Sequence, residues 1–192
     1  MQRDESIRIL GCEGVYSPAE DTFLMLQAVQ VRRDEKVLEM GTGTGMVAVH
    51  LAKAGAMVTA ADIDPDAVRC AKDNASINDV LLNTVESDLY SNVDGTYDLI
   101  IFNPPYLRGE PDTTADRAWA GGPNGTELLH RFLTESEEHL TEGGRMMIIT
   151  SSDMDKGSLD KVLRPYEVRE ISSMRLFFEE LKVLELRLDP SR

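Results

Sequence analysis

The sequence predicts an α/β protein with a doubly wound, mostly parallel sheet of about seven strands, the last one antiparallel, and helices on both faces. Three observations predict this fold. Short apolar runs alternate with segments of helical periodicity along the chain. The first run is followed by a glycine-rich turn, Gly41-Thr42-Gly43-Thr44-Gly45. The last two runs alternate between apolar and polar residues, as a final antiparallel pair does.

The elements follow in chain order. The first helix is expected to start from a capping box, with Ser17 as the N-cap, Pro18 as the first helical residue and Glu20 three residues after the cap, and to run to about Val31. The strands are expected at Lys36–Met40, Met57–Ala61, Val80–Glu86, Tyr97–Phe102, Arg145–Thr150, Val168–Met174 and Leu181–Leu188. The other helices are expected at Met46–Lys53, Asp64–Asn78, Asn124–Leu140 (ended by Gly143-Gly144) and Ser158–Leu163.

With 192 residues, the chain is long enough to bury a substantial core. Residues 15–192 are expected to form one domain, after a flexible segment at 1–14. No apolar stretch reaches the roughly 18–20 residues of a membrane helix, and the first residues lack the apolar centre of a signal peptide. Cys12 and Cys70 fit no metal or disulfide pattern, so a reducing cytoplasm is the expected location.

The net charge of −14, from 34 acidic and 20 basic residues, bears on the class of substrate. Such an average field repels duplex nucleic acid, because the phosphate backbone is itself an array of negative charges. A protein or small-molecule substrate fits the charge better. An acidic surface that only keeps the protein solvated is the alternative interpretation.

Asn103-Pro104-Pro105-Tyr106 directly follows the expected strand Tyr97–Phe102, and in open α/β sheets ligands bind beyond the carboxyl ends of the strands. The two prolines fix φ and remove two N–H donors, so the loop offers bare carbonyls beside one side-chain amide. Such a surface suits a planar NH2 group, against whose flat face Tyr106 can pack. A simple chain-reversing loop and a ligand for a polyproline-binding domain are the alternatives.

One acidic residue is expected at or near the end of each of the first three strands. Glu39 lies two residues before the glycine turn, where a cationic ligand would neutralise a buried carboxylate. Asp62 closes the second strand and can accept from ribose hydroxyls, as in proteins that bind NAD or S-adenosylmethionine. Asp88 follows the third strand, where it can accept from an adenine amino group.

These motifs, in this order, resemble the class I S-adenosylmethionine-dependent methyltransferases that methylate planar nitrogens. Two further stretches, Val15–Phe23 and Arg117–Gly125, resemble the archaeal and eukaryotic branch of the HemK-like release-factor glutamine methyltransferases. The resemblance runs from Val15 over nearly the whole chain. It includes no counterpart of the N-terminal helical domain of the bacterial branch, so substrate docking is expected to fall to the core domain or to a partner.

The resemblance implies a Rossmann-like fold, S-adenosyl-L-methionine as cofactor and a set of site residues. Eight residues would contact the cofactor: Thr22, Glu39, Gly41, Gly43, Asp62, Asp88, Leu89 and Asn103. The catalytic loop would comprise Asn103, Pro104, Pro105 and Tyr106, with no metal ion. The implied substrate is the glutamine of the Gly-Gly-Gln motif in a translation release factor.

The resemblance also implies a small zinc-binding activator subunit along the edge of the third strand. Five apolar residues lie in that region: Ile77, Val80, Leu81, Leu82 and Val85. Ordinary core packing would account for about half of them, since side chains alternate between the faces of a strand. Stable binding to nucleic acid or to a membrane is not expected.

The chemistry expected of the loop needs no strong base. The Oδ1 atom of Asn103 and the carbonyl of Pro104 would each accept an N–H of the substrate amide. His50, His130 and His139 are assigned no role, because none is expected at a strand end. The alternatives are a methyltransferase acting on adenine N6 or guanine N2 in nucleic acid, and a scaffold subunit that binds the cofactor without catalysis. An NAD oxidoreductase is disfavoured, because the third glycine falls one position before that of the dinucleotide fingerprint.

Overall fold

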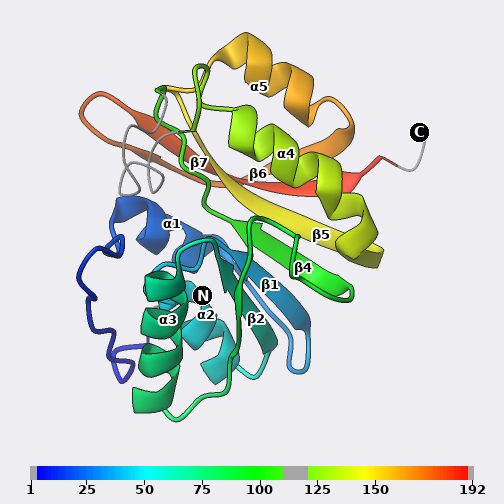
Figure 1. Cartoon of the computed structure of the whole chain (residues 1–192). Coiled ribbons are helices and arrows are strands. Elements are labelled where there is room, and N and C mark those ends of the chain that lie inside the picture. Colours follow the sequence, from blue (N-terminus) through cyan, green and yellow to red (C-terminus); the bar gives the residue numbers. More distant parts are fainter. Residues whose placement is uncertain (1–3, 110–120, 190–192) are drawn as a thin grey trace.

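The computed structural model describes residues 4–109 and 121–189, and over these residues the strands form one sheet in the order β3-β2-β1-β4-β5-β7-β6 (Figure 1). The strands are β1 (Lys36–Met40), β2 (Met57–Asp62), β3 (Asn83–Glu86), β4 (Tyr97–Phe102), β5 (Leu140–Ser151), β6 (Tyr166–Arg175) and β7 (Glu180–Leu188). The first five pair in parallel with one another, and β7 is antiparallel to both β5 and β6. The predicted topology is therefore confirmed.

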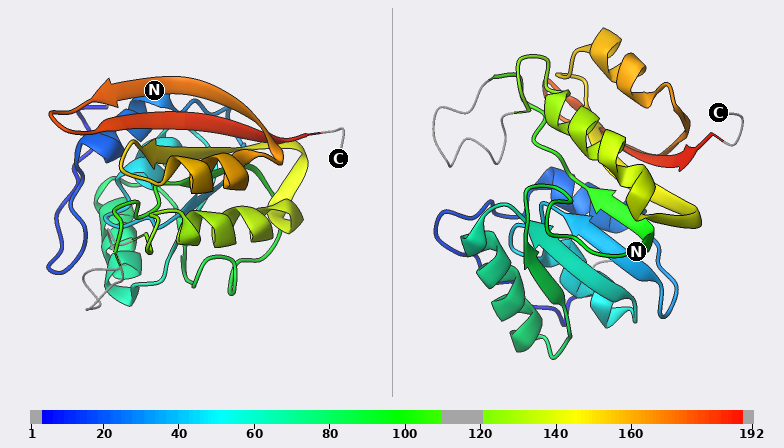
Figure 2. Two further views of the ribbon diagram at one scale, coloured as in Figure 1. Left: turned by 90° about the horizontal axis from the view of Figure 1, so that it is seen from above. Right: turned by 45° about the vertical axis from the view of Figure 1, so that its right-hand side comes forward.

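Helices cover both faces of the sheet (Figure 2). They are α1 (Glu20–Ala28), α2 (Met46–Lys53), α3 (Pro65–Ile77), α4 (Glu127–Glu135) and α5 (Lys156–Leu163), with a 3-10 turn at Ser136–His139. Alternate residues of a strand serve opposite cores, as the period of two requires. In β4, for example, Leu99 and Ile101 pack in the core beneath α1 and α2, whereas Ile100 and Phe102 pack in the core beneath α4.

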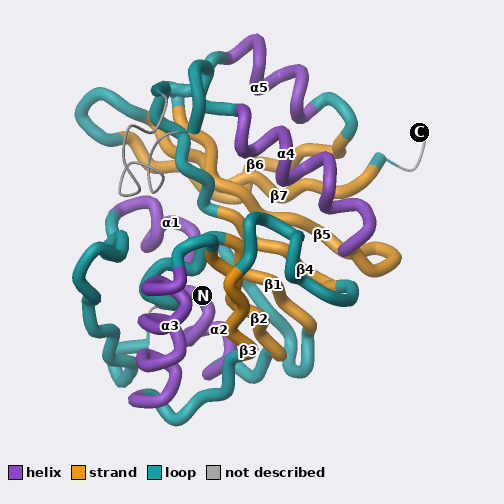
Figure 3. The backbone as a smooth tube through the Cα atoms, in the orientation of Figure 1, coloured by secondary structure: helices purple, strands orange, loops and turns teal. Residues whose placement is uncertain are grey.

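Register aligns the carboxyl ends of the central strands. Met40 at the end of β1 pairs with Ala61 in β2 and with Phe102 at the end of β4. The residues that follow, Gly41 and Asn103, therefore leave the sheet at one level, beside Asp62. The loops after these strands lie at the same end of the sheet (Figure 3).

The first helix begins later than the sequence suggested. Ala19 is the N-cap and the helix starts at Glu20, so the predicted start at Ser17 and Pro18 is wrong. The reason is local, because Thr22 occupies the third helical position and its Oγ1 accepts from the backbone N–H of Ala19 at 3.4 Å. The helix also ends at Ala28 rather than Val31, since the backbone turns extended at Val29.

Several other boundaries also differ from the prediction. The helix expected over Asn124–Leu140 is α4 followed by the 3-10 turn, β5 starts at Leu140 rather than Arg145, and β6 starts at Tyr166 rather than Val168. Strand β3 starts at Asn83 rather than Val80, and α5 starts two residues before Ser158, after Asp155 caps it. Gly143-Gly144 do not follow a helix, because they lie inside β5. There they form an irregularity in the pairing with β4, where the positive φ of Gly143 (74°) accommodates the extra residues.

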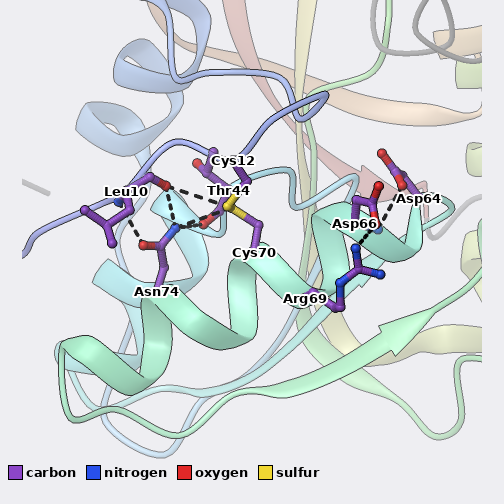
Figure 4. Close-up of a disulfide and its surroundings, with 8 residues drawn as sticks. All are labelled: Leu10, Cys12, Thr44, Asp64, Asp66, Arg69, Cys70 and Asn74. Atoms are coloured by element: carbon purple, nitrogen blue, oxygen red, sulfur yellow. Dashed lines mark hydrogen bonds and ion pairs between the residues drawn. A yellow bond between two sulfur atoms is a disulfide. The ribbon is translucent and has the colours of Figure 1, made fainter.

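The N-terminal segment, expected to be flexible, has no regular secondary structure over 4–14 but is anchored to α3 (Figure 4). Asn74 accepts from the N–H of Leu10 at 2.8 Å and donates to its carbonyl at 3.0 Å. Asn78 makes the same pair of bonds to Arg8, at 2.9 and 2.7 Å. The spacings match, because four helical residues rise by about 6 Å and two extended residues by about 6.6 Å.

Cys12 and Cys70 continue this pattern by one more step and form a disulfide (Figure 4). The expectation that they are unpaired is therefore wrong. Their separation of 58 residues gave no local pattern to recognise. The pairing becomes visible only once Cys70 is placed one helical turn before Asn74, on the face of α3 that meets the N-terminal segment.

Candidate functional site

A cavity of about 1180 Å³ opens at the carboxyl ends of β1, β2 and β4. Single small-molecule sites are usually about 300–1,000 Å³, so there is room here for a cofactor and a substrate side chain together. All eleven residues predicted for the site line it: Thr22, Glu39, Gly41, Gly43, Asp62, Asp88, Leu89, Asn103, Pro104, Pro105 and Tyr106.

The glycine turn after β1 forms the floor of the cavity. Gly41, Gly43 and Gly45 all adopt positive φ (65°, 53° and 75°), which L side chains rarely adopt. Gly45 has a second reason to be glycine, because a Cβ there would lie 2.8 Å from the backbone of Ala71 in α3. The turn thus brings bare backbone to the cavity, without side chains at its three glycines, and lets α2 and α3 pack closely.

Glu39 is a buried carboxylate at the end of β1. Its Oε2 accepts from the Thr42 hydroxyl at 2.6 Å and from the Ala48 N–H at 3.0 Å. Burial raises the pKa of Glu39 to about 8, against these hydrogen bonds, and the charge of Asp62 adds to the rise. Among the residues that the structure describes, no cationic side chain forms an ion pair with it, so a cation in the cavity would stabilise the ionised form.

Asp62 closes β2 with its carboxylate at the cavity. One oxygen accepts from the N–H of Gly43 at 2.9 Å and the other from the N–H of Asp64 at 3.0 Å. Burial raises the pKa of Asp62 above its ordinary value. Each oxygen retains a further lone pair, so the side chain can accept from two vicinal hydroxyl groups.

Asp88 and Leu89 lie beyond β3 in different environments. The Asp88 side chain is about half exposed and accepts from Arg131 at 3.3 Å. Leu89 is buried and has a φ of 48°, which is uncommon for a non-glycine residue. The hydroxyl of Ser87 donates to the Leu89 carbonyl at 2.6 Å and stabilises this turn, which presents Leu89 as an apolar wall.

Asn103 has one end of its amide bonded and the other end open. Its Nδ2 donates to Asp21 at 2.9 Å, while its Oδ1 is buried with no partner in the described part of the chain. A carboxylate can only accept, so Asp21 fixes the rotation of the amide and leaves the oxygen as a vacant acceptor. An orphaned buried acceptor is costly unless a ligand supplies the donor.

Asp21 is the residue that sequence reasoning missed. It is buried at the start of α1, where it also accepts from the N–H of Thr22 at 2.6 Å and from the hydroxyl of Tyr16 at 3.3 Å. It lies 82 residues before Asn103 in the chain. The available signal was its place in the Val15–Phe23 stretch, which carried part of the family resemblance.

A second segment clamps the loop that follows β4. Gly121 donates from its N–H to the Leu107 carbonyl at 2.8 Å. A Cβ on Gly121 would collide with the carbonyl oxygen of Pro105, and one on Gly125 with that of Tyr106. Both positions thus require glycine for close approach. They belong to the Arg117–Gly125 stretch of the resemblance, of which residues 117–120, including Trp119, lie outside the described residues.

Pro104 and Tyr106, which belong to the predicted catalytic loop, differ in how deeply they are buried. Pro104 is buried, and Tyr106 is half-buried between the two cores. Burial first, and then the charges of Asp21 and Glu179, raise the pKa of Tyr106, so its phenol stays neutral. The three histidines do not line the cavity.

Comparison with known proteins identifies the family. The model of the methyltransferase small domain matches residues 6–174. A protein of Methanocaldococcus jannaschii, provisionally named a protein N5-glutamine methyltransferase, is 38% identical over 94% of this chain and 95% of its own. The release factor glutamine methyltransferase of Deinococcus radiodurans is 34% identical over 68% of this chain and 51% of its own.

The fold is shared with solved structures. The E. cuniculi Mtq2–Trm112 complex, responsible for methylation of the translation termination factor eRF1, contains a chain with a TM-score of 0.72 at 24% identity. That match covers 92% of this chain and 99% of the other. The resemblance derived from the sequence is confirmed, and the chain belongs to the methyltransferase small domain family as an S-adenosylmethionine-dependent methyltransferase of the class I fold.

Proposed function

We propose that the protein methylates the side-chain amide nitrogen of a glutamine in a translation release factor. The observation that carries this proposal is the vacant Oδ1 acceptor of Asn103, held by Asp21 just before the Pro104 carbonyl in the chain. An amide NH2 supplies two N–H donors in one plane, and the side-chain oxygen and the backbone carbonyl can each accept one of them. The names of the two relatives support the choice of a glutamine and of a release factor.

The residues at the end of the sheet fit S-adenosylmethionine, which supplies an electrophilic methyl group on a sulfonium centre when bound. We assign Asp62 to its ribose hydroxyls, Asp88 to its adenine amino group and Leu89 to the apolar wall beside the base. The glycine backbone at Gly41 and Gly43, which lets a ligand approach closely, and the hydroxyl of Thr22 complete the set. Glu39 lies unpaired with any described cation, so it provides the negative charge that a cationic cofactor requires.

The loop after β4 would then promote methyl transfer by orienting the substrate amide. Asn103 Oδ1 and the Pro104 carbonyl each accept an N–H of the substrate amide, which directs the nitrogen lone pair toward the cofactor pocket. Both acceptors also stabilise positive charge that develops on the nitrogen. Neither proline has an N–H that could compete for them. Correct alignment of the reacting atoms can contribute roughly 7–11 kcal/mol when the geometry is ideal.

The electrostatics of the cavity support a protein substrate over a nucleic acid. Seven acidic residues line it within the described part of the chain: Asp21, Glu39, Asp62, Asp64, Asp88, Glu127 and Glu179. Arg131 is the one cationic residue among the described lining residues, and it already contacts Asp88. A polynucleotide would bring its phosphates into this negative field.

A small zinc-binding activator subunit at the β3 edge is part of the proposal. Strand β3 is an outer strand of the sheet, and Leu81 just before it is 93% exposed. An uncovered apolar edge is an aggregation hazard, which a partner would remove. We also propose a cytoplasmic location, where translation termination takes place. The cysteine content no longer supports that location, because Cys12 and Cys70 are paired.

The test is incubation with methyl-labelled S-adenosylmethionine and a purified release factor, followed by mass spectrometry. We expect one methyl group, on the glutamine of the Gly-Gly-Gln motif. Total RNA and DNA serve as competing acceptors in the same experiment. Label in adenine or guanine with none in the protein would overturn the proposal, and the absence of all transfer would favour a binding scaffold.

A further inference from the structure

Two phenylalanines at the tip of the β6–β7 hairpin are almost completely exposed. Phe177 is 100% and Phe178 98% exposed. Surface apolar residues are common singly, but two adjacent large aromatic side chains that are both almost fully exposed call for an explanation. The hairpin tip, Leu176–Glu179, projects from the sheet at the end where α1 lies (Figures 1 and 2).

The local backbone does not account for these residues. Leu176 donates from its N–H to the Glu179 carbonyl at 2.7 Å, so the two phenylalanines occupy the central positions of a tight hairpin turn. Such positions favour Gly, Asn and Asp, which turn easily and remain solvated. Phenylalanine neither favours the backbone of a turn nor is well solvated, so its presence points to a contact made outside this chain.

The tip is firmly attached to the body of the protein. Leu176 packs against the core beneath α1 and α2. Ser151 donates from its hydroxyl to the Glu179 carboxylate at 2.6 Å, and the backbone of Glu180 exchanges two hydrogen bonds with Ser152, at 2.9 and 3.0 Å. The phenylalanines therefore sit on a held scaffold, which lowers the entropic cost of binding a partner.

The same turn belongs to the mouth of the cavity. Glu179, next to Phe178 in sequence, lines the cavity, and its charge adds to the rise in pKa that burial causes at both Tyr16 and Tyr106. A macromolecule whose side chain enters the cavity past Tyr106 must therefore pass beside the hairpin tip. The neighbouring charges of Asp21 and Glu179 are negative, which favours a partner surface with basic residues.

We propose that Phe177 and Phe178 are the docking anchor for the protein substrate, inserted into an apolar recess beside its target glutamine and bordered by basic side chains. This inference rests on the proposed function and deepens it. Aromatic side chains at the centre of an interface commonly carry most of its binding energy. Docking on the hairpin would bring a folded protein to a cavity that also admits a short peptide.

The test compares two substrates with the double variant Phe177→Ser/Phe178→Ser in the full chain. For the folded release factor, we expect kcat/KM to fall by about 10–100-fold through KM, the range for loss of an aromatic anchor. For a short synthetic peptide that contains the glutamine, kcat/KM should stay unchanged, as should affinity for S-adenosylmethionine and Tm. The matched control is Val168→Ser, because Val168 is 45% exposed on the same hairpin but near the opposite end of β6. This variant should leave kcat/KM unchanged for both substrates.

The outcomes are distinguishable. If the wild-type protein does not methylate the release factor, the proposed function fails and this inference with it. If the wild type methylates the release factor and the double variant has the same kcat/KM for it, only the docking role is overturned. An equal loss on peptide and protein, or a lower Tm, would show that the phenylalanines serve the cavity or the fold. A fourth outcome would assign the phenylalanines to a membrane instead. In it, the wild type but not the double variant cosediments with anionic lipid vesicles, and the double variant methylates the release factor as fast as the wild type.

Discussion

At the scale of single residues, the site depends on a few polar groups whose bonding is left incomplete. The carboxylates near the strand ends could be predicted from sequence, because parallel strands present their carboxyl ends at one edge of the sheet. The orientation of Asn103 could not, because it depends on Asp21 in a helix far away in the chain. What decides the chemistry is thus a tertiary contact to a residue that the motif does not contain.

Asn103→Ala is expected to separate binding from chemistry. Removal of the vacant acceptor should lower the rate of methyl transfer by about 10²–10³-fold, the loss typical for one preorganised polar group. Cofactor affinity should fall only modestly, since Glu39, Asp62 and the glycine turn remain. Single-turnover kinetics at saturating cofactor and substrate would check this, and a near-normal rate would exclude the mechanism. Asn103→Asp should also be poor, because two carboxylates would then face each other at Asp21.

Asp62→Ala is expected to weaken cofactor binding. The substitution leaves two ribose hydroxyls without their acceptor, which should cost roughly 1.5–3 kcal/mol, the range for a hydrogen bond to a charged group. Isothermal titration calorimetry measures the change directly. Asp66→Ala is the control, since Asp66 is an exposed acid in the first turn of α3 that does not line the cavity. Equal affinity in wild type and Asp62→Ala would remove Asp62 from the site.

Glu39 makes a prediction about pH. Its folded-state pKa of about 8 lies above the ordinary value of 4.5, so between these values the folded protein binds more protons than the unfolded chain. The contribution of this group to stability is therefore present below pH 4.5 and is lost as the pH rises to about 8. A bound cation favours the ionised form of Glu39 instead of the protonated form, because it stabilises the carboxylate.

Affinity for the cationic cofactor should accordingly increase with pH up to about 8, by at most roughly tenfold per pH unit. Affinity for the demethylated product, whose sulfur is neutral, should change little. Glu39→Gln should remove the difference between the two slopes. Titration of both ligands at several pH values, with calorimetry in buffers of different ionisation heat to count protons released, would measure it. Parallel slopes in the wild type would contradict this role.

At the scale of elements, the hydrophobic period and the glycine turn predicted β1, β4 and α2 and the mostly parallel sheet with a final antiparallel pair. The failures have physical causes. The start of α1 moved because Thr22 takes over the capping contact, and Gly143-Gly144 joined β5 because a strand can absorb extra residues as an irregularity. The anchoring of residues 4–14 had no local pattern, since its partners are side chains on one face of α3.

Gly125→Ala tests the clamp that holds the catalytic loop. The new Cβ would collide with the Tyr106 carbonyl oxygen, and the φ of 73° is itself unfavourable for alanine by about 1–2 kcal/mol. We expect lower thermal stability and a turnover reduced at least tenfold, because the loop must move. Affinity for the cofactor should be largely retained.

Gly143→Ala is the matched control for the clamp. Its φ of 74° imposes the same backbone cost, but a Cβ there meets nothing within 4 Å. Stability should fall by a similar amount as in Gly125→Ala, while turnover stays near that of the wild type. If both variants lose turnover equally, the effect of Gly125→Ala comes from general destabilisation and the clamp has no specific role.

At the scale of the whole molecule, surface charge and one edge of the sheet decide what the protein meets. The net charge of −14 extends into the cavity, so the negative field that surrounds the protein also reaches the reacting groups. Among the helices that the structure describes, none has the length and apolarity to cross a membrane. Besides the hairpin tip, the β3 edge presents an exposed apolar residue, Leu81, that a covering partner would bury.

The structure changes which residue should test the β3 edge. Leu82, one of the five apolar residues expected at this edge, packs against the core, so a charge there would damage the fold. Leu81 is 93% exposed and its replacement by aspartate should leave the monomer intact. We therefore expect Leu81→Asp to keep its Tm and to lose a stoichiometric small zinc-binding subunit that the wild type retains on affinity purification from its native source. Recombinant wild-type protein that is soluble, monomeric and fully active without that subunit would show that the edge needs no partner.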